Sequence, residues 1–591
     1  MRRIGILAAA AVPVLLAQAA ITASPAIAGD AGHAGHAGHL GHVSSHVPTV
    51  TVNAAAPFRA VTHVAAGGLY ALARPGDPAN SLLYPLHLNS VVQMAPGGKQ
   101  LPNGEPVPAG DALVVNPSAT DAGANEIVRM PDIYPNFPYK WVSWPNWLSK
   151  VDQMVRARLR ASNDTNIAAW ELWNEPDWTW DTSAAGPFDA GWVRTYREVR
   201  KLDTITPIQG PSISRWDESY MRNFLSYAKA HHALPDVISW HELGGPDSIT
   251  ADVAACVALE KSLKITPRPI SIEEYGTTSE INDPGSLVPY LARFERSGVT
   301  NAERAFWYEY GTVDGLVTVS GVNGTTTNQP TGTWWLYKWY GDMTGSMVTV
   351  TPPAQSALDG LASYDPLSKT ADIIVGGASG TTNVTVSGIG ALGSSVRALV
   401  ESTSTPDRFT AEDSPHVVSQ QTLTDRGGRV TVQIPGMDAD SAYRVLLRPA
   451  DGSGVRQLYY AANASIHNAA IAASPGAPDG YYVGDLTHSG DARDDSFVDF
   501  LVNVPTGHSY AMTVDYANPG RGDAALGLAY DGGPWQTLAY PPTGNGWGTI
   551  TRPVRLHAGY NVIRLAMGAP SFAGGSGVVH LGSIHLRPQG R

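Results

Sequence analysis

The stretch AAWELWNEPDW, residues 168–178, places an acidic side chain, Glu175, between an asparagine and a proline. Three tryptophans and two further acids crowd around it. A carboxyl group that is buried near other negative charge can keep its proton near neutral pH, which a general acid requires. If Glu175 takes part in catalysis by a pair of carboxyl groups, a second acid must follow at a predictable position in the fold.

The elements that would position such a pair are indicated by the pattern of residues 47–346. Short apolar runs alternate there with amphipathic helical stretches. One of these helices is predicted to begin at Ser143, with Pro145 in its first turn. Its expected apolar face contains Leu148, Val151, Val155 and Leu159. About eight such repeats over this length predict a closed (β/α)8 barrel.

Eight strands are expected in this region. In order they are residues 67–73, 125–131, 138–143, 167–174, 205–210, 236–245, 269–276 and 304–311. The segment between the first two, residues 84–120, is interpreted as a long insertion that shapes specificity at the barrel mouth.

The chemistry of such barrels lies at the carboxyl ends of the strands. Glu175 is expected to end the fourth strand, because Pro176 cannot continue the ladder. The seventh strand ends with Glu273 and Glu274, and Glu274 follows Glu175 by 99 residues, or three βα units of 33 residues. This matches the roughly 30 residues of such a unit, so the two acids should face each other across the mouth. Since successive strand residues point to opposite faces, only one of Glu273 and Glu274 should look into it.

The combination of WNEP and EEYG resembles the clan A retaining glycoside hydrolases, and WELWNEPD is most similar to their family 39. That family contains β-xylosidases, α-iduronidases and arabinose-releasing enzymes. The resemblance implies that Glu175 is the acid/base and that Glu274, which precedes Tyr-Gly, is the nucleophile. Glu273 stays open as the alternative nucleophile. Asn174 is implied to hydrogen-bond the 2-hydroxyl of the sugar.

Three further residues are candidates for substrate binding. Arg129, at the end of the predicted second strand, either lies beside the nucleophile or forms a structural ion pair. His241 ends the sixth strand. It either places a ring near the nucleophile or is a structural histidine. Trp307 either forms the floor of the sugar-binding site from the eighth strand or packs in the core. The spare acids Glu242 and Glu309 are assigned to hydrogen-bond networks.

Beyond the barrel, alternating runs predict a β-sandwich over residues 347–450 and a C-terminal β jelly roll over residues 455–591. The alternation of residues 47–54 allows an early strand to join the sandwich. The last unit resembles carbohydrate-binding modules of families 6 and 35. Tyr460 and Ala462 stand where those modules carry calcium-binding glutamates, so we assign no metal site there.

The N-terminus predicts secretion. Residues 1–28 have the basic start, apolar run and small-residue cleavage motif of a signal peptide, and residues 29–46 form a leader rich in histidine, glycine and alanine. No membrane association is expected after cleavage. The single cysteine, Cys256, is interpreted as a small buried hydrophobe.

The net charge of −12, without a basic cluster in the mature chain, argues against nucleic acid as a partner. With 16 tryptophans and 24 tyrosines, the chain suits neutral, hydroxylated ligands such as carbohydrates. No cofactor and no metal are expected, and the oligomeric state stays open.

The sequence therefore predicts a secreted retaining glycoside hydrolase that acts on plant or microbial polysaccharide or oligosaccharide through a covalent glycosyl-enzyme. A xylosidase-like and an arabinose- or galactose-releasing activity both stay open. The alternative from another class is an inactive polysaccharide-binding protein on a barrel scaffold. A metal carrier that uses the histidine leader is a third hypothesis.

Overall fold

The computed structural model describes residues 47–589, apart from short gaps at residues 162, 163, 165, 320–327, 355, 356, 367, 413, 451–456, 468, 475, 479, 489–494, 505, 558, 569–571 and 573. The predicted signal peptide and leader lie outside the described residues. Within the described part of the chain, none of the helices combines the length and the apolar character that crossing a bilayer requires.

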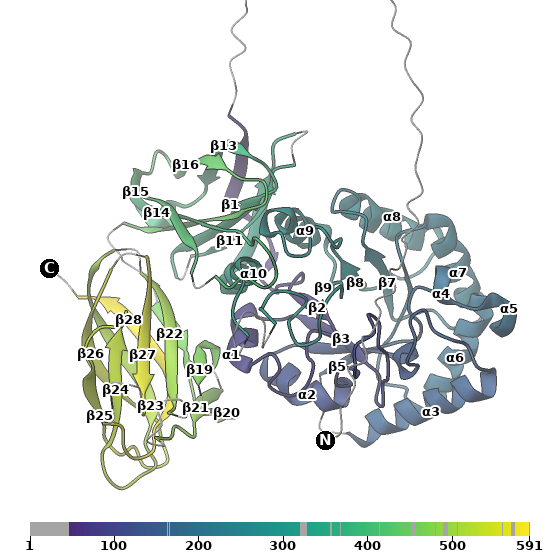
Figure 1. The fold of residues 1–591 in the computed structure, drawn as a ribbon. Helices are drawn as coiled ribbons and strands as arrows, with labels where there is room; N and C mark the ends of the chain where they lie inside the picture. Colours follow the sequence, from purple (N-terminus) through teal and green to yellow (C-terminus); the bar gives the residue numbers. More distant parts are fainter. Residues whose placement is uncertain are drawn as a thin grey trace, which may run out of the picture. The chain divides into compact units, whose positions relative to one another are not determined.

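Eight parallel strands close into the predicted barrel (Figure 1). They are β2 (Gly67–Leu69), β3 (Ser90–Met94), β4 (Asn125–Arg129), β5 (Ile167–Glu171), β6 (Ile208–Ile213), β7 (Val237–Glu242), β8 (Ile270–Tyr275) and β9 (Asn301–Arg304). The helices that follow these strands lie around the barrel. They are α1 (Asn80–Leu83), α2 (Ala112–Asp121), α3 (Trp144–Arg160), α4 (Pro176–Thr179), α5 (Thr182–Ala185), α6 (Phe188–Leu202), α7 (Glu218–Ala230), α8 (Ile249–Ser262), α9 (Pro284–Ser297) and α10 (Gly332–Asp342).

The order of the early strands differs from the prediction. The second strand is β3, which lies inside the segment interpreted as an insertion, so β4 with Arg129 is the third strand. All five residues of β3 are buried, and a strand buried on both faces shows no alternation. The predicted third strand, residues 138–143, is an irregular connection that leads into α3.

The eighth strand was also placed too late. β9 ends at Arg304, so only the first residue of the predicted range 304–311 belongs to it. Glu303 and Arg304 are fully buried, and two charged residues in a strand hide its apolar character. Trp307 consequently lies in the loop after the strand.

The start of α3 is confirmed. Ser143 caps the helix by accepting a hydrogen bond from the backbone N–H of Asn146. Val151 and Val155 are buried as expected, but Trp147 and Met154 complete the buried face. Leu159 is 43% exposed, because the helix continues past the surface that it covers.

A nine-stranded sheet forms the second unit, around a hydrophobic core of its own. In sheet order it contains β15 (His416–Thr424), β14 (Ser395–Thr403), β17 (Ala442–Pro449), β12 (Thr370–Gly376), β11 (Asp359–Asp365), β10 (Ser346–Thr351), β1 (Thr49–Ala60), β13 (Gly380–Ser387) and β16 (Arg429–Met437).

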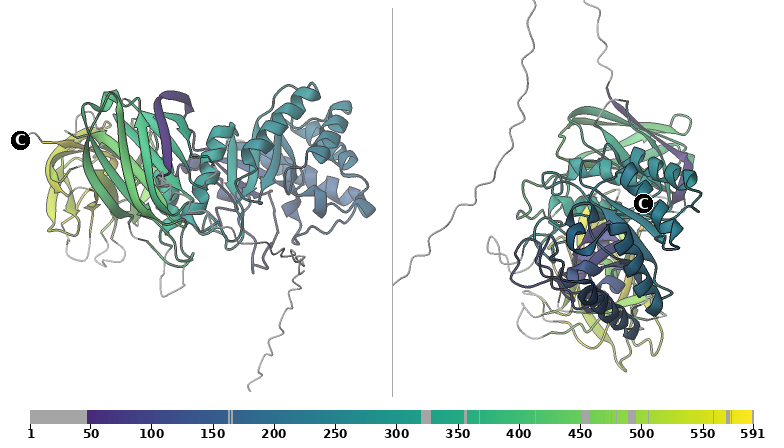
Figure 2. Two further views of the ribbon diagram at one scale, coloured as in Figure 1. Left: turned by 90° about the horizontal axis from the view of Figure 1, so that it is seen from above. Right: turned by 90° about the vertical axis from the view of Figure 1, so that its right-hand side faces the viewer.

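Strand β1 belongs to this sheet and not to the barrel, so the barrel boundary of 47–346 is corrected at its start. It pairs antiparallel with β10 and parallel with β13. Figure 2 shows the purple β1 among the green strands of the sheet. Alternate residues of β1, such as Val50 and Val52, are buried in the core of this sheet.

The C-terminal residues form two further antiparallel sheets with a separate core. One contains β18 (Gln457–Tyr460), β20 (Ala470–Ala473), β21 (Tyr481–Gly484), β23 (His508–Ala517), β26 (Gly548–Leu556) and β28 (His580–Pro588). The other contains β19 (Ser465–His467), β22 (Phe497–Val504), β24 (Ala524–Tyr530), β25 (Gln536–Tyr540) and β27 (Gly559–Ala566).

Because this unit has its own core, we predict that residues 455–591 fold in isolation. The polypeptide should melt in one cooperative transition, as followed by circular dichroism. Addition of EDTA should leave the midpoint unchanged, since the glutamates expected to hold calcium are missing. A clear fall of the midpoint in EDTA would reveal a metal site that the sequence did not indicate.

Candidate active site

Glu175 lies just beyond the fourth strand of the barrel. β5 ends at Glu171, and Glu175 is the residue before the first turn of α4. Its backbone is left-handed, with φ 51° and ψ 51°, a conformation that costs a non-glycine residue about 1 kcal/mol. The backbone holds this turn, because the N–H of Glu175 donates to Ser212 O at 2.8 Å. The side chain is thereby directed over the barrel mouth.

A β-bulge places both Glu273 and Glu274 inside the barrel. Between Ile272 and Tyr275, β8 advances three residues while each neighbouring strand advances two. The extra residue breaks the alternation of side chains. Both glutamates are buried, and both have an oxygen 3.8 Å from Nε2 of His241. The alternation of side chains, from which we expected only one of them to look into the mouth, therefore does not hold at this point of β8.

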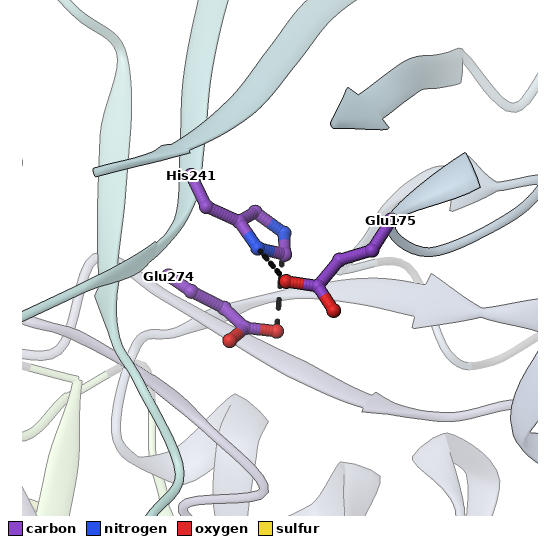
Figure 3. A group of neighbouring side chains, drawn as sticks. All are labelled: Glu175, His241 and Glu274. Carbon is purple, nitrogen blue, oxygen red and sulfur yellow. Dashed lines mark hydrogen bonds and ion pairs between the residues drawn. The ribbon is translucent and has the colours of Figure 1, made fainter. Parts of the chain in front are cut away.

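His241, in β7, lies between Glu175 and Glu274 (Figure 3). Its Nδ1 is 3.2 Å from Oε1 of Glu175, and its Nε2 is 3.8 Å from Oε1 of Glu274. Burial lowers the pKa of His241, but the charge of Glu274 and the hydrogen bond to Glu175 outweigh it and raise the pKa above its ordinary value. The ring thus links the two carboxyl groups.

The two carboxyl groups are close to each other. One oxygen of Glu175, one oxygen of Glu274 and a ring nitrogen of His241 all lie within 4.8 Å of one another. Retaining glycosidases hold their carboxyl groups about 5 to 5.5 Å apart, and inverting enzymes hold them about 6.5 to 9.5 Å apart. The observed spacing is shorter than that of an inverting pair.

Arg129 joins the candidate nucleophile to the acid at the end of β5. Its Nη1 donates to Oε1 of Glu274 and its Nε donates to Oε2 of Glu171, both at 2.7 Å. Burial by itself lowers the pKa of Arg129, but the charges of these two glutamates hold it well above its ordinary value. Of the two alternatives left open for Arg129, contact with Glu274 and a structural ion pair, the structure shows both.

Exposure separates the two adjacent glutamates. The side chain of Glu274 is 12% exposed, whereas that of Glu273 is fully buried. Oε1 of Glu273 accepts a hydrogen bond from Nε2 of Gln209, and burial raises the pKa of this carboxyl. Glu274 is therefore the one that a substrate at the mouth can reach, and Glu273 lies below it in the barrel.

Asn174 and Trp307 are placed differently. Asn174 is 2% exposed, and its Oδ1 has no hydrogen-bond partner among the described residues. Trp307 is half-buried, and its Nε1 donates to Gly276 O at 3.0 Å. Gly276 follows Glu274 by two residues, so Trp307 is attached to the end of the strand that carries the candidate nucleophile. The structure gives Trp307 no direct bond to Glu175 or Glu274.

Sequence reasoning missed a buried polar cluster beside Arg129. Tyr70 and Tyr139 each donate a hydrogen bond to Asp132, at 2.8 and 2.9 Å, and Gln100 bonds to both tyrosines. Burial raises the pKa of Asp132 to about 7, although Arg129 and the two hydroxyl groups act in the opposite direction. Tyr70 directly follows β2, and its position at the carboxyl end of a strand could have identified it.

The spare acids are bonded as the sequence led us to expect. Glu242 accepts hydrogen bonds from Nε1 of Trp240 and Oγ of Ser248. Glu309 forms an ion pair with Arg408.

Glu175, His241 and Glu274 are also close enough together to ligate a divalent cation. A cation at this point would lie next to the guanidinium group of Arg129, which is bonded to Glu274 and would repel it. The charge distribution favours acid–base and nucleophilic chemistry over metal binding.

The Arg129 ion pairs predict a large stability effect. Arg129→Met should lower the free energy of unfolding by roughly 3–5 kcal/mol, because it leaves buried carboxylates without a counter-charge. Urea denaturation would measure the change. Arg156→Met is the matched control, since Arg156 pairs with Asp152 on the exposed face of α3, and it should leave stability unchanged. Equal effects of the two substitutions would contradict the prediction.

The sequence is similar to those of two curated arabinofuranosidases. No family model matches the chain. A 3-O-α-D-galactosyl-α-L-arabinofuranosidase of Bifidobacterium longum subsp. longum is 28% identical over an alignment of 381 residues, and the match covers 54% of this chain and 32% of that enzyme. A 3-O-β-L-arabinopyranosyl-α-L-arabinofuranosidase of Bifidobacterium pseudocatenulatum is 27% identical over an alignment of 373 residues, and the match covers 53% of this chain and 37% of that enzyme. The matched regions thus span about a third of the length of these two relatives.

Among solved structures, N2152 from Neocallimastix frontalis is 33% identical, with a TM-score of 0.63, and the match covers 68% of this chain and 99% of that protein. The two curated relatives are glycoside hydrolases by name. The chain is therefore a relative of glycoside hydrolases, and it belongs to the same family as N2152 of Neocallimastix frontalis.

Proposed function

We propose that this protein is a secreted retaining glycoside hydrolase of the family 39 type. The observation that carries the proposal is the spacing of Glu175 and Glu274, whose oxygens lie within 4.8 Å of each other at the carboxyl end of a (β/α)8 barrel. That spacing leaves no room for a water molecule between one carboxylate and the sugar, as an inverting enzyme would need.

In the proposed reaction Glu274 attacks the anomeric carbon while Glu175 gives its proton to the leaving oxygen, which forms a covalent glycosyl-enzyme. Glu175 then removes a proton from water, and the water releases the sugar. Arg129 fixes the orientation of the Glu274 carboxylate through their hydrogen bond. His241 contacts both carboxyl groups and keeps their relative positions fixed.

Asn174 is proposed to bind the sugar that is attacked. Its Oδ1 is buried and has no partner among the described residues, and such an atom is expected to find one in the substrate. A hydrogen bond to the 2-hydroxyl would strengthen in the transition state, where positive charge develops at the anomeric carbon.

For the substrate class we propose α-L-arabinofuranosides of plant or microbial polysaccharides or oligosaccharides. Both curated relatives are α-L-arabinofuranosidases whose names place another sugar on O3 of the arabinose. A screen of p-nitrophenyl glycosides, with the α-L-arabinofuranoside and the β-D-xyloside as the leading pair, tests this choice. Absence of turnover on every glycoside of the screen and on polysaccharides would favour the inactive, polysaccharide-binding alternative.

The other units are proposed to support this activity. The nine-stranded sheet would be the β-sandwich that accompanies the barrel, and residues 455–591 would be a jelly roll that binds glycans without calcium. The predicted signal peptide would export the enzyme to its polymeric substrate.

The roles of the two glutamates at the end of β8 can be separated. Glu274→Ala should remove nearly all turnover, and azide should restore a glycosyl azide of inverted anomeric configuration, because the small anion occupies the vacated position. Glu273→Gln should retain the ability to form the covalent intermediate, as measured by burst kinetics. Full activity of Glu274→Ala would transfer the nucleophile role to Glu273 or exclude the mechanism.

The spacing also predicts the stereochemistry. The first-formed sugar should keep the anomeric configuration of the substrate, as read by NMR before mutarotation. Glu175→Ala should lose hydrolysis of substrates with poor leaving groups and keep the glycosylation step for leaving groups of low pKa, which need no proton. An inverted first product would show that the two carboxyl groups do not act as proposed.

A further inference from the structure

The connection between β14 and β15 reaches from the nine-stranded sheet to the start of α10. Four hydrogen bonds of 2.7–2.9 Å join them: Thr403 Oγ1 to Gly332 O, Thr333 N to Thr405 Oγ1, Glu412 N to Pro330 O and Trp335 Nε1 to Glu412 O. A Cβ on Gly332 would lie 1.9 Å from Ser404 O, so only glycine permits this approach. The connection is thus fixed against the barrel.

Arg408, in this connection, contacts the loop that follows β9. Its guanidinium group forms an ion pair with Glu309 and lies 4.1 Å from the ring centre of Tyr308 and 4.3 Å from that of Phe409. Asp407 holds the turn, because it accepts a hydrogen bond from the backbone N–H of Phe409 at 2.8 Å. The side chain of Arg408 is only 21% exposed, and partial removal from water strengthens a cation–π contact.

The loop that Arg408 covers is attached to the end of β8. Tyr308 Oη donates to Thr278 O, and Trp307 Nε1 donates to Gly276 O, both at 3.0 Å. The backbone N–H groups of Trp307 and Tyr308 both donate to Oδ1 of the buried Asp314. Asp314 and the residues that directly follow β8 therefore hold both aromatic residues, and Arg408 contacts Tyr308.

We infer that Arg408 is a positioning residue, through which the nine-stranded sheet fixes the Trp307–Tyr308 loop beside Glu274 and so takes part in forming the substrate site. This inference rests on the proposed function in one respect, namely that the substrate binds next to Glu274. The positioning of the loop itself can be tested without any substrate.

The test compares Arg408→Ala and Arg408→Lys with Arg296→Ala. Arg296 also joins the barrel to the nine-stranded sheet, through Asp359 and Gly360 O, but it lies on α9 and makes no contact with the loop. Hydrogen–deuterium exchange of the amides of residues 307 and 308 reports the loop directly. Steady-state kinetics on p-nitrophenyl α-L-arabinofuranoside, or on the p-nitrophenyl glycoside that the screen selects, report binding.

Arg408→Ala should speed exchange of both amides and raise KM by roughly 3- to 30-fold with kcat nearly unchanged. Arg408→Lys keeps the ion pair without the planar stacking. Its amide exchange rates and its KM should lie between those of Arg408→Ala and those of the protein without substitutions. Arg296→Ala should leave exchange of these amides and KM as they are.

Unchanged exchange in Arg408→Ala would overturn the inference. Faster exchange with an unchanged KM would overturn its substrate-binding part. If the protein without substitutions turns over no glycoside, the proposed function is refuted. The exchange measurement still decides in that case whether Arg408 positions the loop.

Discussion

The guanidinium group of Arg129 is the charge on which the barrel mouth depends. It is 1% exposed, and it bonds at 2.7 Å to a glutamate of β5 and to a glutamate of β8, strands that are not neighbours. An isolated buried carboxylate would be strongly unfavourable, so Glu171 and Glu274 are tolerated together because the cation lies between them. Arg129 thereby couples the closure of the barrel to the position of the candidate nucleophile.

Two local departures from regular backbone bring the second carboxyl group to the first. The bulge in β8 adds one residue where Glu273 and Glu274 occur, so both side chains turn inward and occupy successive depths of the barrel. The left-handed turn at Glu175 directs that side chain across the mouth. Strained conformations of this kind persist where the surrounding structure fixes them, here through the hydrogen bond to Ser212.

The rim of the mouth is built by elements far apart in the chain. Trp307 and Tyr308 follow the last barrel strand, while Arg408 comes from the nine-stranded sheet. The hydroxyl groups of Tyr70 and Tyr139 meet at Asp132, on the side of Arg129. The barrel loops and the connection between β14 and β15 thus meet on this side of the barrel, where the close contact at Gly332 joins the two units.

The sequence by itself determined the barrel, the pairing of Glu175 with the end of β8 and the alternating strands of the later sheets. These features have local signals, namely a helical or strand period, a proline after an acid and a constant length of the βα unit. It also led us to expect carboxyl groups near each other, because the strands of a closed barrel end on one face.

The tertiary structure decided the remainder. The fully buried β3 shows no alternation, and the charges of Glu303 and Arg304 hide the last strand, so the strand order was wrong although Arg129 still lies at a carboxyl end. Which of Glu273 and Glu274 reaches the mouth depends on a bulge that the neighbouring strands impose, and the sheet to which β1 belongs depends on partners almost 300 residues away. Contacts between residues so far apart in the chain produce no periodic pattern in the sequence, so only the packing of the tertiary structure determines them.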